Sequence, residues 1–240
     1  MRLILSAILL LALLPLKSQA ASDWFEIERD GKYWDQVAYY LPDGAHDVQG
    51  ILFEGYTDTY LAVMYTYDVS TEIWDGSVVD EQSDGLIAGT LSGDDFELLF
   101  EIPDPEGVES PYEYGSIDFG SFTVDGEDID ALFTLGIYYS GDSVLNAYTL
   151  CDCDEEELEI EWVPEVEIAD RHPAGIKVAP ELGGVIVWMQ DPDTFWYEPF
   201  RVVQILYALE KSEGYRLVED RRSVTKELYE FLPDEPPIDW

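Results

Sequence analysis

Cations are scarce in this sequence of 240 residues, which has 12 Lys and Arg residues against 52 Asp and Glu residues and a formal net charge of −40. No Lys or Arg occurs from residue 33 to residue 170. Nucleic acid phosphates are bound mainly by Lys and Arg, so the shortage argues against nucleic acid as a partner. For the same reason we do not expect docking on an anionic lipid surface.

Histidine and cysteine are also rare. The only histidines are His46 and His172, so we do not expect a transition-metal site built on His. The only cysteines are Cys151 and Cys153, whose Cα atoms in an extended strand would lie ~6.6 Å apart, at the edge of disulfide geometry. We expect two thiols or a strained bridge, neither of which would hold the fold together. The sequence contains no nucleophile-elbow, P-loop or dinucleotide motif.

The apolar run from residue 3 to 14 follows Arg2 and is followed by Ser18-Gln19-Ala20. This pattern predicts a signal peptide over residues 1–20, cut near Ala20, because the run is shorter than the ~18–20 residues that span a bilayer. We therefore expect a secreted or periplasmic protein without membrane insertion.

Cleavage at this point would leave ten cations and 52 acids, a formal charge of −42. A surface of this kind repels itself at low ionic strength and is tolerated when salt screens it. Because the acids are spread along the chain, we favour halophilic adaptation as the explanation. A function that uses the charge, such as binding a basic partner, is the alternative.

Turn residues recur at short intervals and separate segments rich in Tyr, Phe, Val, Ile and Thr, which is typical of strands. This spacing predicts a mainly β domain over residues 21–195, an antiparallel β-sandwich or jelly roll. The turns include Asp84-Gly85, Ser92–Asp95 and Asp125-Gly126. The expected strands are Trp34–Leu41, Val48–Glu54, Thr59–Tyr67, Leu86–Leu91, Phe96–Ile102, Tyr114–Val124, Ala131–Tyr139, Val144–Leu150, Glu157–Trp162 and Gly184–Met189.

The last part of the chain, residues 196–240, has a different pattern. Apolar residues at 202, 205, 206 and 209 fit one face of a helix over Arg201–Lys211, with a hairpin turning at Ser212–Gly214 as the alternative. A second helix is expected over Ser223–Leu232, before Pro233. We expect a small, partly helical segment whose cations pack it on the acidic sandwich.

An alternating acidic stretch is the strongest candidate for chemistry. In a strand, Glu157, Glu159 and Glu161 would share one face. Crowded carboxylates raise one another's pKa, and retaining glycosidases need a pair of carboxyl groups ~5–5.5 Å apart. The alternative is a strand face that simply contacts water.

The segment Glu157–Trp162 resembles the Glu-Ile-Asp-Ile-Glu strand of family 16 glycoside hydrolases, and Tyr112–Phe119 resembles an upstream Tyr-Gly segment of that family. The resemblance implies a concanavalin-like jelly roll that cleaves β-glucans or galactans with retention. It assigns Glu157 as nucleophile, Glu159 as assisting carboxylate and Glu161 as acid/base. Glu159 stands where the family has Asp, and the Arg that follows the upstream segment is absent.

Aromatic residues are plentiful, with 7 Trp, 16 Tyr and 10 Phe. Aromatic rings stack on sugars, but they also fill strands and cores. The candidates for glycan binding are Trp162, Trp188, Trp196, Tyr197 and Tyr138.

Two acidic turns, one containing Asp80 and Asp84 and the other Asp125 and Asp128, offer oxygen ligands for a structural calcium ion. Neither turn matches an EF-hand, and we expect no other cofactor. The sequence thus favours an exported glycan-interacting protein, either a carbohydrate-binding module or a divergent retaining glycosidase. The alternatives are an inhibitor or immunity-type protein that binds a basic partner, and a structural envelope protein of a halophile.

Overall fold

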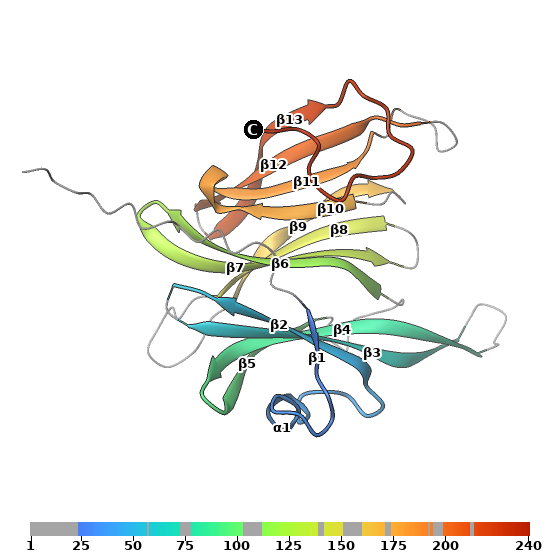
Figure 1. Cartoon of the computed structure of the whole chain (residues 1–240), viewed down its shortest axis with the longest axis vertical. Coiled ribbons are helices and arrows are strands. Elements are labelled where there is room, and N and C mark those ends of the chain that lie inside the picture. The colour runs from blue at the N-terminus through green and yellow to red at the C-terminus, as the bar shows by residue number, and fades with distance from the viewer. Residues whose placement is uncertain are drawn as a thin grey trace, which may run out of the picture.

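Three antiparallel sheets are stacked on one another in the computed structural model (Figure 1). It describes residues 24–56, 58–72, 78–102, 112–138, 142–150, 160–170, 174–191, 193, 199–211 and 214–240. Within each sheet the order of the strands is their order in the chain. Each sheet is therefore a meander formed by one continuous part of the sequence.

The N-terminal sheet has the order β1-β2-β3-β4-β5. Its strands are β1 (Phe25–Glu26), β2 (His46–Glu54), β3 (Thr59–Glu72), β4 (Val78–Ser92) and β5 (Asp95–Ile102). The short helix α1 (Trp34–Val37) lies against the outer side of this sheet (Figure 1).

The middle sheet consists of β6 (Tyr112–Val124), β7 (Glu127–Tyr138), β8 (Asp142–Leu150) and β9 (Ile160–Asp170). The C-terminal sheet consists of β10 (Ala174–Ala179), β11 (Gly184–Gln190), β12 (Val202–Lys211) and β13 (Tyr215–Val224), with the 3-10 turn η1 (Pro180–Leu182) between β10 and β11. None of the helices in the described part of the chain could span a membrane.

The middle sheet is buried on both faces. One face packs on the N-terminal sheet, where the rings of Phe53 and Phe119 stack 5.0 Å apart. The other face packs on the C-terminal sheet through Phe122, Phe133 and Leu145. Both interfaces are apolar, so burial of nonpolar surface is the main force that holds the three sheets together.

The outer faces of the stack are covered as well. On the N-terminal sheet, Val37 of α1 is buried beside Leu61 and Val63. On the C-terminal sheet, residues 225–240 run back across the strands without helix or strand structure of their own, and we call them the strap (Figure 1).

The expected mainly β, antiparallel sandwich is confirmed. Its architecture is a stack of three sheets, and the described strands show no crossing from sheet to sheet of the kind that the Greek keys of a jelly roll require. One expected strand, Trp34–Leu41, is wrong because α1 occupies its first half. Trp34, Val37 and Leu41 are spaced three and four residues apart, which is the spacing of one face of a helix. All three pack in the apolar cluster on the outer face of the N-terminal sheet.

The expected C-terminal helices are also wrong. Residues 202–211 form β12, which pairs with β11 on one side and with β13 on the other. The antiparallel pairing of β12 with β13 agrees with the alternative expectation of a hairpin. The helical pattern was misleading because β12 is buried on both faces and is apolar at nearly every position. Consequently residues 196–240 supply two strands of a sheet that begins before residue 195. In Ser223–Leu232, Tyr229 pairs with Phe200 as an isolated bridge.

The turn at Asp125-Gly126 is confirmed, and both residues have a positive φ, of 52° and 86°. The turn expected at Asp84-Gly85 is wrong because both residues lie inside β4. Gly85 pairs with Tyr65, and a Cβ on Gly85 would overlap the Tyr65 ring. The glycine therefore makes room for a neighbouring aromatic ring and does not mark a turn.

Candidate functional site

The two segments that resemble glycoside hydrolases occur on opposite edges of the middle sheet. Tyr112–Phe119 belongs to β6 and Glu161 and Trp162 belong to β9, with β7 and β8 between them. In β9, Glu161 pairs with Thr149 and Trp162 pairs with Tyr148 of β8. Glu157 and Glu159 lie outside the described residues, as do Cys151 and Cys153. The arrangement of the three expected catalytic residues therefore lies outside the part of the chain that the structure describes.

A sugar-stacking role for Trp188 is wrong. Its side chain is only 4% exposed, and Nε1 donates a hydrogen bond to the carbonyl oxygen of Pro233 in the strap at 2.8 Å. Its ring covers Gly175, where an added Cβ would overlap the ring. Trp188 is thus a core residue. Trp196, Tyr197 and the side chains of Tyr138 and Trp162 lie outside the described part.

The two acidic segments expected to offer calcium ligands lie in different settings. Asp80 and Asp84 lie in β4, so the expected loop around them is wrong, and Asp84 accepts a hydrogen bond from Oγ1 of Thr66 at 3.0 Å. Asp125 lies in a tight turn and Asp128 just after it, where Oγ1 of Thr123 donates to Asp128 at 2.8 Å. No three His, Cys, Asp or Glu residues of the described part are arranged to hold a metal ion.

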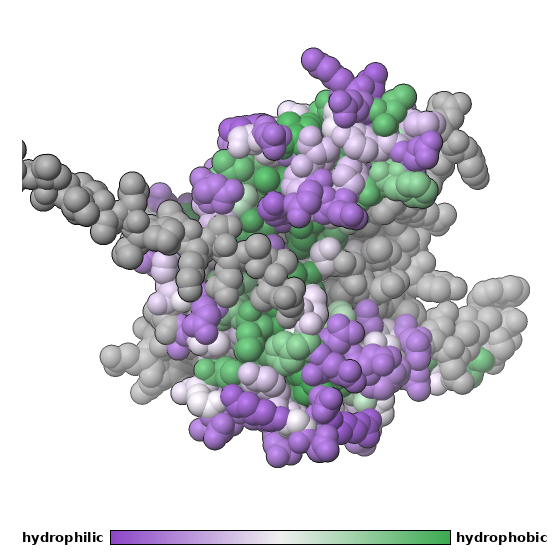
Figure 2. Space-filling model, in the orientation of Figure 1, coloured by the Kyte–Doolittle hydropathy of each residue, from purple (hydrophilic) through white to green (hydrophobic). Residues whose placement is uncertain are grey.

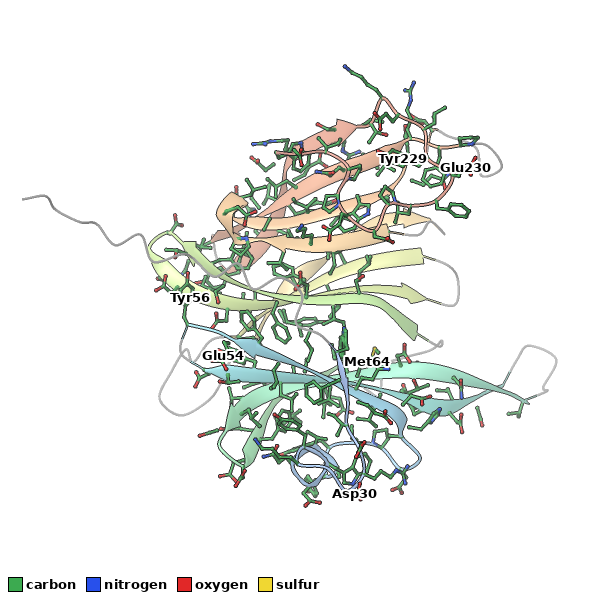
Figure 3. All side chains as sticks on the ribbon, in the orientation of Figure 1. Asp30, Glu54, Tyr56, Met64, Tyr229 and Glu230 are labelled. Atoms are coloured by element: carbon green, nitrogen blue, oxygen red, sulfur yellow. The ribbon has the colours of Figure 1, made fainter. Side chains whose placement is uncertain are left out.

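A buried carboxylate, Asp130, joins the middle sheet to the N-terminal sheet. It is 3% exposed and accepts hydrogen bonds from the backbone N–H of Tyr56 at 3.0 Å, from the Tyr60 hydroxyl at 3.3 Å and from the Ser121 hydroxyl. Gly55 allows this approach, since a Cβ there would overlap Oδ2 of Asp130. Figure 3 shows Tyr56 at this junction. Burial, the largest influence, raises the pKa of Asp130, while the three donors lower it.

A second carboxylate, that of the half-buried Asp118, joins the middle sheet to the C-terminal sheet. It accepts hydrogen bonds from the backbone N–H groups of Val178 in β10 at 3.1 Å and of Phe119 at 2.9 Å. Burial raises the pKa of Asp118, although these two bonds lower it. Because all the donors at Asp118 and Asp130 are structural, we interpret the two carboxylates as links between sheets and not as a catalytic pair.

A two-stranded extension projects from the N-terminal sheet. The last residue of β3 that pairs with β2 is Thr66, and the first residue of β4 that pairs with β5 is Leu86. Residues 67–72 of β3 and 78–83 of β4 therefore pair only with each other among the described strands. We call these two segments the acidic ribbon. They project from one end of the stack (Figure 1).

The acidic ribbon carries four acids, Asp68, Glu72, Asp80 and Glu81, and no cation. The register places Gln82 opposite Asp68 and Ser70 opposite Asp80, so no two acids face each other directly across the strands. The side chains of Asp68, Ser70, Val78 and Gln82 are exposed. Hydrophilic residues cover the part of β3 and β4 that leads to the ribbon in Figure 2.

His46 lies at the base of the acidic ribbon. Its Nε2 atom is 3.3 Å from Nε2 of Gln82 and 3.8 Å from Oδ2 of Asp47, and its Nδ1 atom is 3.2 Å from the carbonyl oxygen of Gly44. The ring therefore connects the turn before β2 to the ribbon.

Cations occur in the C-terminal sheet, and several of them form ion pairs there. The ion pairs of the described residues include Lys177–Glu235 at 2.8 Å, Arg216–Glu210 at 3.3 Å and Arg222–Glu219 at 2.7 Å. Lys211 and the hydroxyl of Tyr215 both donate to Glu127 at the end of the middle sheet. The hydrogen bond from Lys211 lowers the pKa of Glu127. These cations therefore already have acidic partners, whereas the two segments of the acidic ribbon contain no cation of their own.

Sequence reasoning missed the ribbon because it ended one strand at Tyr67 and assigned Asp80 and Asp84 to a turn. It also missed Asp118 and Asp130, although each interrupts an apolar run, Ile117-Asp118-Phe119 and Ile129-Asp130-Ala131, and such an interruption was the available signal. No protein family, no curated protein and no solved structure matches the chain.

Proposed function

We propose that this protein is an exported binding protein that holds a basic partner along the acidic ribbon. The observation that carries the proposal is the ribbon itself, a pair of strands with four acids and no cation that extends past both neighbouring strands. The partner is a protein or peptide segment rich in Lys or Arg.

The physical argument has two parts. A two-stranded hairpin without further strands is marginally stable in water, so a projecting one gains stability when a partner covers it. Four acids without a cation on one ribbon also attract a positively charged partner, because opposite charges attract. Val78, which is 63% exposed, adds apolar surface for the same contact.

A defined cationic probe tests the proposal. We would titrate the full chain with a fluorescent decamer of lysine at ~0.15 M salt, where the Debye length is ~8 Å. The ribbon variant is Asp68→Asn/Glu72→Gln/Asp80→Asn/Glu81→Gln. The matched control, Asp43→Asn/Asp94→Asn/Asp95→Asn/Asp125→Asn, removes the same charge from exposed turn and strand-end residues.

We expect the ribbon variant to bind the probe about tenfold more weakly than the wild type, because four salt-screened contacts of about 0.3–0.4 kcal/mol each amount to that factor. The control variant should bind within about twofold of the wild type. Equal losses in both variants would mean that the probe senses only net charge, and the proposal would fail.

A glycan-binding function is the second candidate. It rests on the resemblance of Glu157–Trp162 to the catalytic strand of family 16 glycoside hydrolases, and Glu161 and Trp162 lie in the edge strand β9. A β-glucan and galactan array with the wild type, Trp162→Ala, Glu161→Gln and Glu157→Gln separates the outcomes. Glycan binding by the wild type that is lost in Trp162→Ala, with no release of sugar, indicates a carbohydrate-binding module. Sugar release lost in Glu161→Gln and in Glu157→Gln indicates a retaining hydrolase, and absence of both activities in the wild type refutes this candidate.

A further inference from the structure

The strap is attached to the C-terminal sheet as a bound peptide would be. Residues 225–240 form no helix and no strand, and Tyr229 pairs with Phe200 through two backbone hydrogen bonds of 2.7 and 2.8 Å. The four strands beneath keep their own hydrogen-bond ladders. Thr225 still belongs to this pairing, because its N–H and hydroxyl oxygen are hydrogen-bonded to the backbone of Val202 in β12. The strap after Thr225 can therefore leave the sheet without breaking the pairing of any of the four strands.

Several contacts hold the backbone of the strap and not its side chains. Gln204 is fully buried, and its amide accepts a hydrogen bond from the N–H of Ile238 at 2.9 Å and donates one to the carbonyl oxygen of Ile238 at 2.7 Å. Trp188 donates to the carbonyl oxygen of Pro233. Backbone hydrogen bonds combined with pockets for side chains are the usual way in which a sheet binds an extended peptide.

The strap also has the composition of a ligand for this face. Its three prolines at 233, 236 and 237 favour an extended chain that loses little entropy on binding. It carries five acids and one cation. The face beneath offers cations, since Lys177 pairs with Glu235 at 2.8 Å and the guanidinium of Arg221 lies 5.4 Å from the ring centre of Trp240.

Part of the apolar surface of the strap remains uncovered. Leu228 and Phe231 are 60% and 82% exposed, and Val224, just before the strap, is 44% exposed. These residues lie in or next to the first half of the strap, whereas Leu232 and Trp240 pack on the sheet. Figure 3 labels Tyr229 and Glu230 in this first half.

We propose that the outer face of the C-terminal sheet is a binding site for an extended acidic peptide, and that its ligand from outside is the strap of a second copy of this chain. Two copies that exchange straps reproduce the contacts of the single chain. The two exchanged straps cross near their first halves, which brings the exposed Val224, Leu228 and Phe231 of both copies together. This additional burial is what favours the exchanged dimer over the single chain.

Concentration and salt control the exchange. A tethered strap competes at an effective concentration of the order of millimolar, so the dimer should form only in concentrated protein. Two chains of formal charge −40 repel each other, and salt must screen this repulsion. We therefore expect a monomer at ~10 mM salt and a growing dimer fraction at ~1 M salt.

The decisive test uses two variants, each of which reverses the charge of one partner of the Lys177–Glu235 ion pair. Lys177→Glu places two acids together in a single chain, and Glu235→Lys places two cations together. Each variant alone therefore has a repulsive contact at this position, whether as a monomer or as a dimer of identical chains.

A mixed dimer with exchanged straps removes both repulsive contacts. The outer face of the Lys177→Glu chain then holds the strap of the Glu235→Lys chain, and the unchanged Lys177 of the second chain meets the unchanged Glu235 of the first. Native mass spectrometry of the mixed full-length variants at millimolar protein, after exchange at ~1 M salt, measures the mixed fraction. The mixed dimer should exceed both dimers of identical chains several-fold.

The control is a second ion pair that does not involve the strap. Lys211 and Glu127 join two sheets of the same chain, so a mixture of Lys211→Glu and Glu127→Lys should give no excess of mixed dimer. An equal mixed fraction in the two experiments would overturn the proposal. So would a wild-type chain that stays monomeric at ~1 M salt and millimolar concentration.

Discussion

The buried carboxylate of Asp130 gives the sharpest prediction on stability. Replacing Asp130 by Ala removes the acceptor for the Tyr56 N–H, the Tyr60 hydroxyl and the Ser121 hydroxyl at a site that is 3% exposed. A buried donor left without a partner costs ~1–3 kcal/mol, and hydroxyls can turn to other acceptors. We therefore expect Asp130→Ala to lower the free energy of unfolding by about 2–4 kcal/mol.

Asp130→Asn is the matched variant because it keeps the shape and one acceptor oxygen. With the amide oxygen in the place of Oδ2, the Tyr56 N–H and the Tyr60 hydroxyl can still donate to it, and the Ser121 hydroxyl can accept from the new amide nitrogen. We expect this change to cost less than about 1 kcal/mol at neutral pH, since it also removes a buried charge.

The two variants differ from the wild type in their pH dependence. Burial raises the pKa of Asp130 above its usual value of 3.8, so the folded chain binds this proton more tightly than the unfolded chain. The corresponding stability is complete below the unfolded pKa and is lost as the pH rises through the folded pKa. Wild type should therefore gain stability relative to Asp130→Asn as the pH falls from 7 toward ~4.

Urea unfolding at several pH values, in ~1 M salt to screen the other acids, measures both effects. The reasoning would be refuted if Asp130→Ala and Asp130→Asn were equally stable. It would also be refuted if the difference between wild type and Asp130→Asn did not change with pH.

Two further predictions concern charge and packing. The melting temperature should rise clearly between ~10 mM and ~1 M sodium chloride, because the Debye length falls from ~30 to ~3 Å and the salt screens the net charge. A flat profile would contradict the expectation of halophilic adaptation. Gly175→Ala should lower the free energy of unfolding by about 1–3 kcal/mol and increase the exposure of Trp188, because the new Cβ would overlap its ring; urea unfolding followed by Trp fluorescence checks both effects.

The fold class could be predicted from the sequence because turns and β-formers alternate along most of the chain. Strands such as Val48–Glu54 and Phe96–Ile102 were expected close to where β2 and β5 are found. The stack of three sheets could not be predicted, since strands such as β12 that are buried on both faces lack the alternation that tells inside from outside. For the same reason β12 fitted a helix as well as a strand.

The candidate site was less predictable than the fold. Asp residues normally favour turns, so Asp68, Asp80 and Asp84 led to a prediction of strands shorter than β3 and β4. Only the cross-strand pairing shows the acidic ribbon. Trp188 was expected to contact a ligand because an aromatic residue alone does not tell whether a later segment covers it. The covering segment is the strap, far along the chain, as the hydrogen bond from Trp188 to Pro233 shows.

Hydrogen exchange of the full chain with and without the lysine decamer tests the central claim most directly. The account predicts slower exchange of the backbone amides in residues 67–72 and 78–83 when the decamer is bound, and no change at the turn formed by Asp125 and Gly126. Protection spread evenly over the acidic turns, or confined to the middle sheet, would contradict the claim that the acidic ribbon is the binding site.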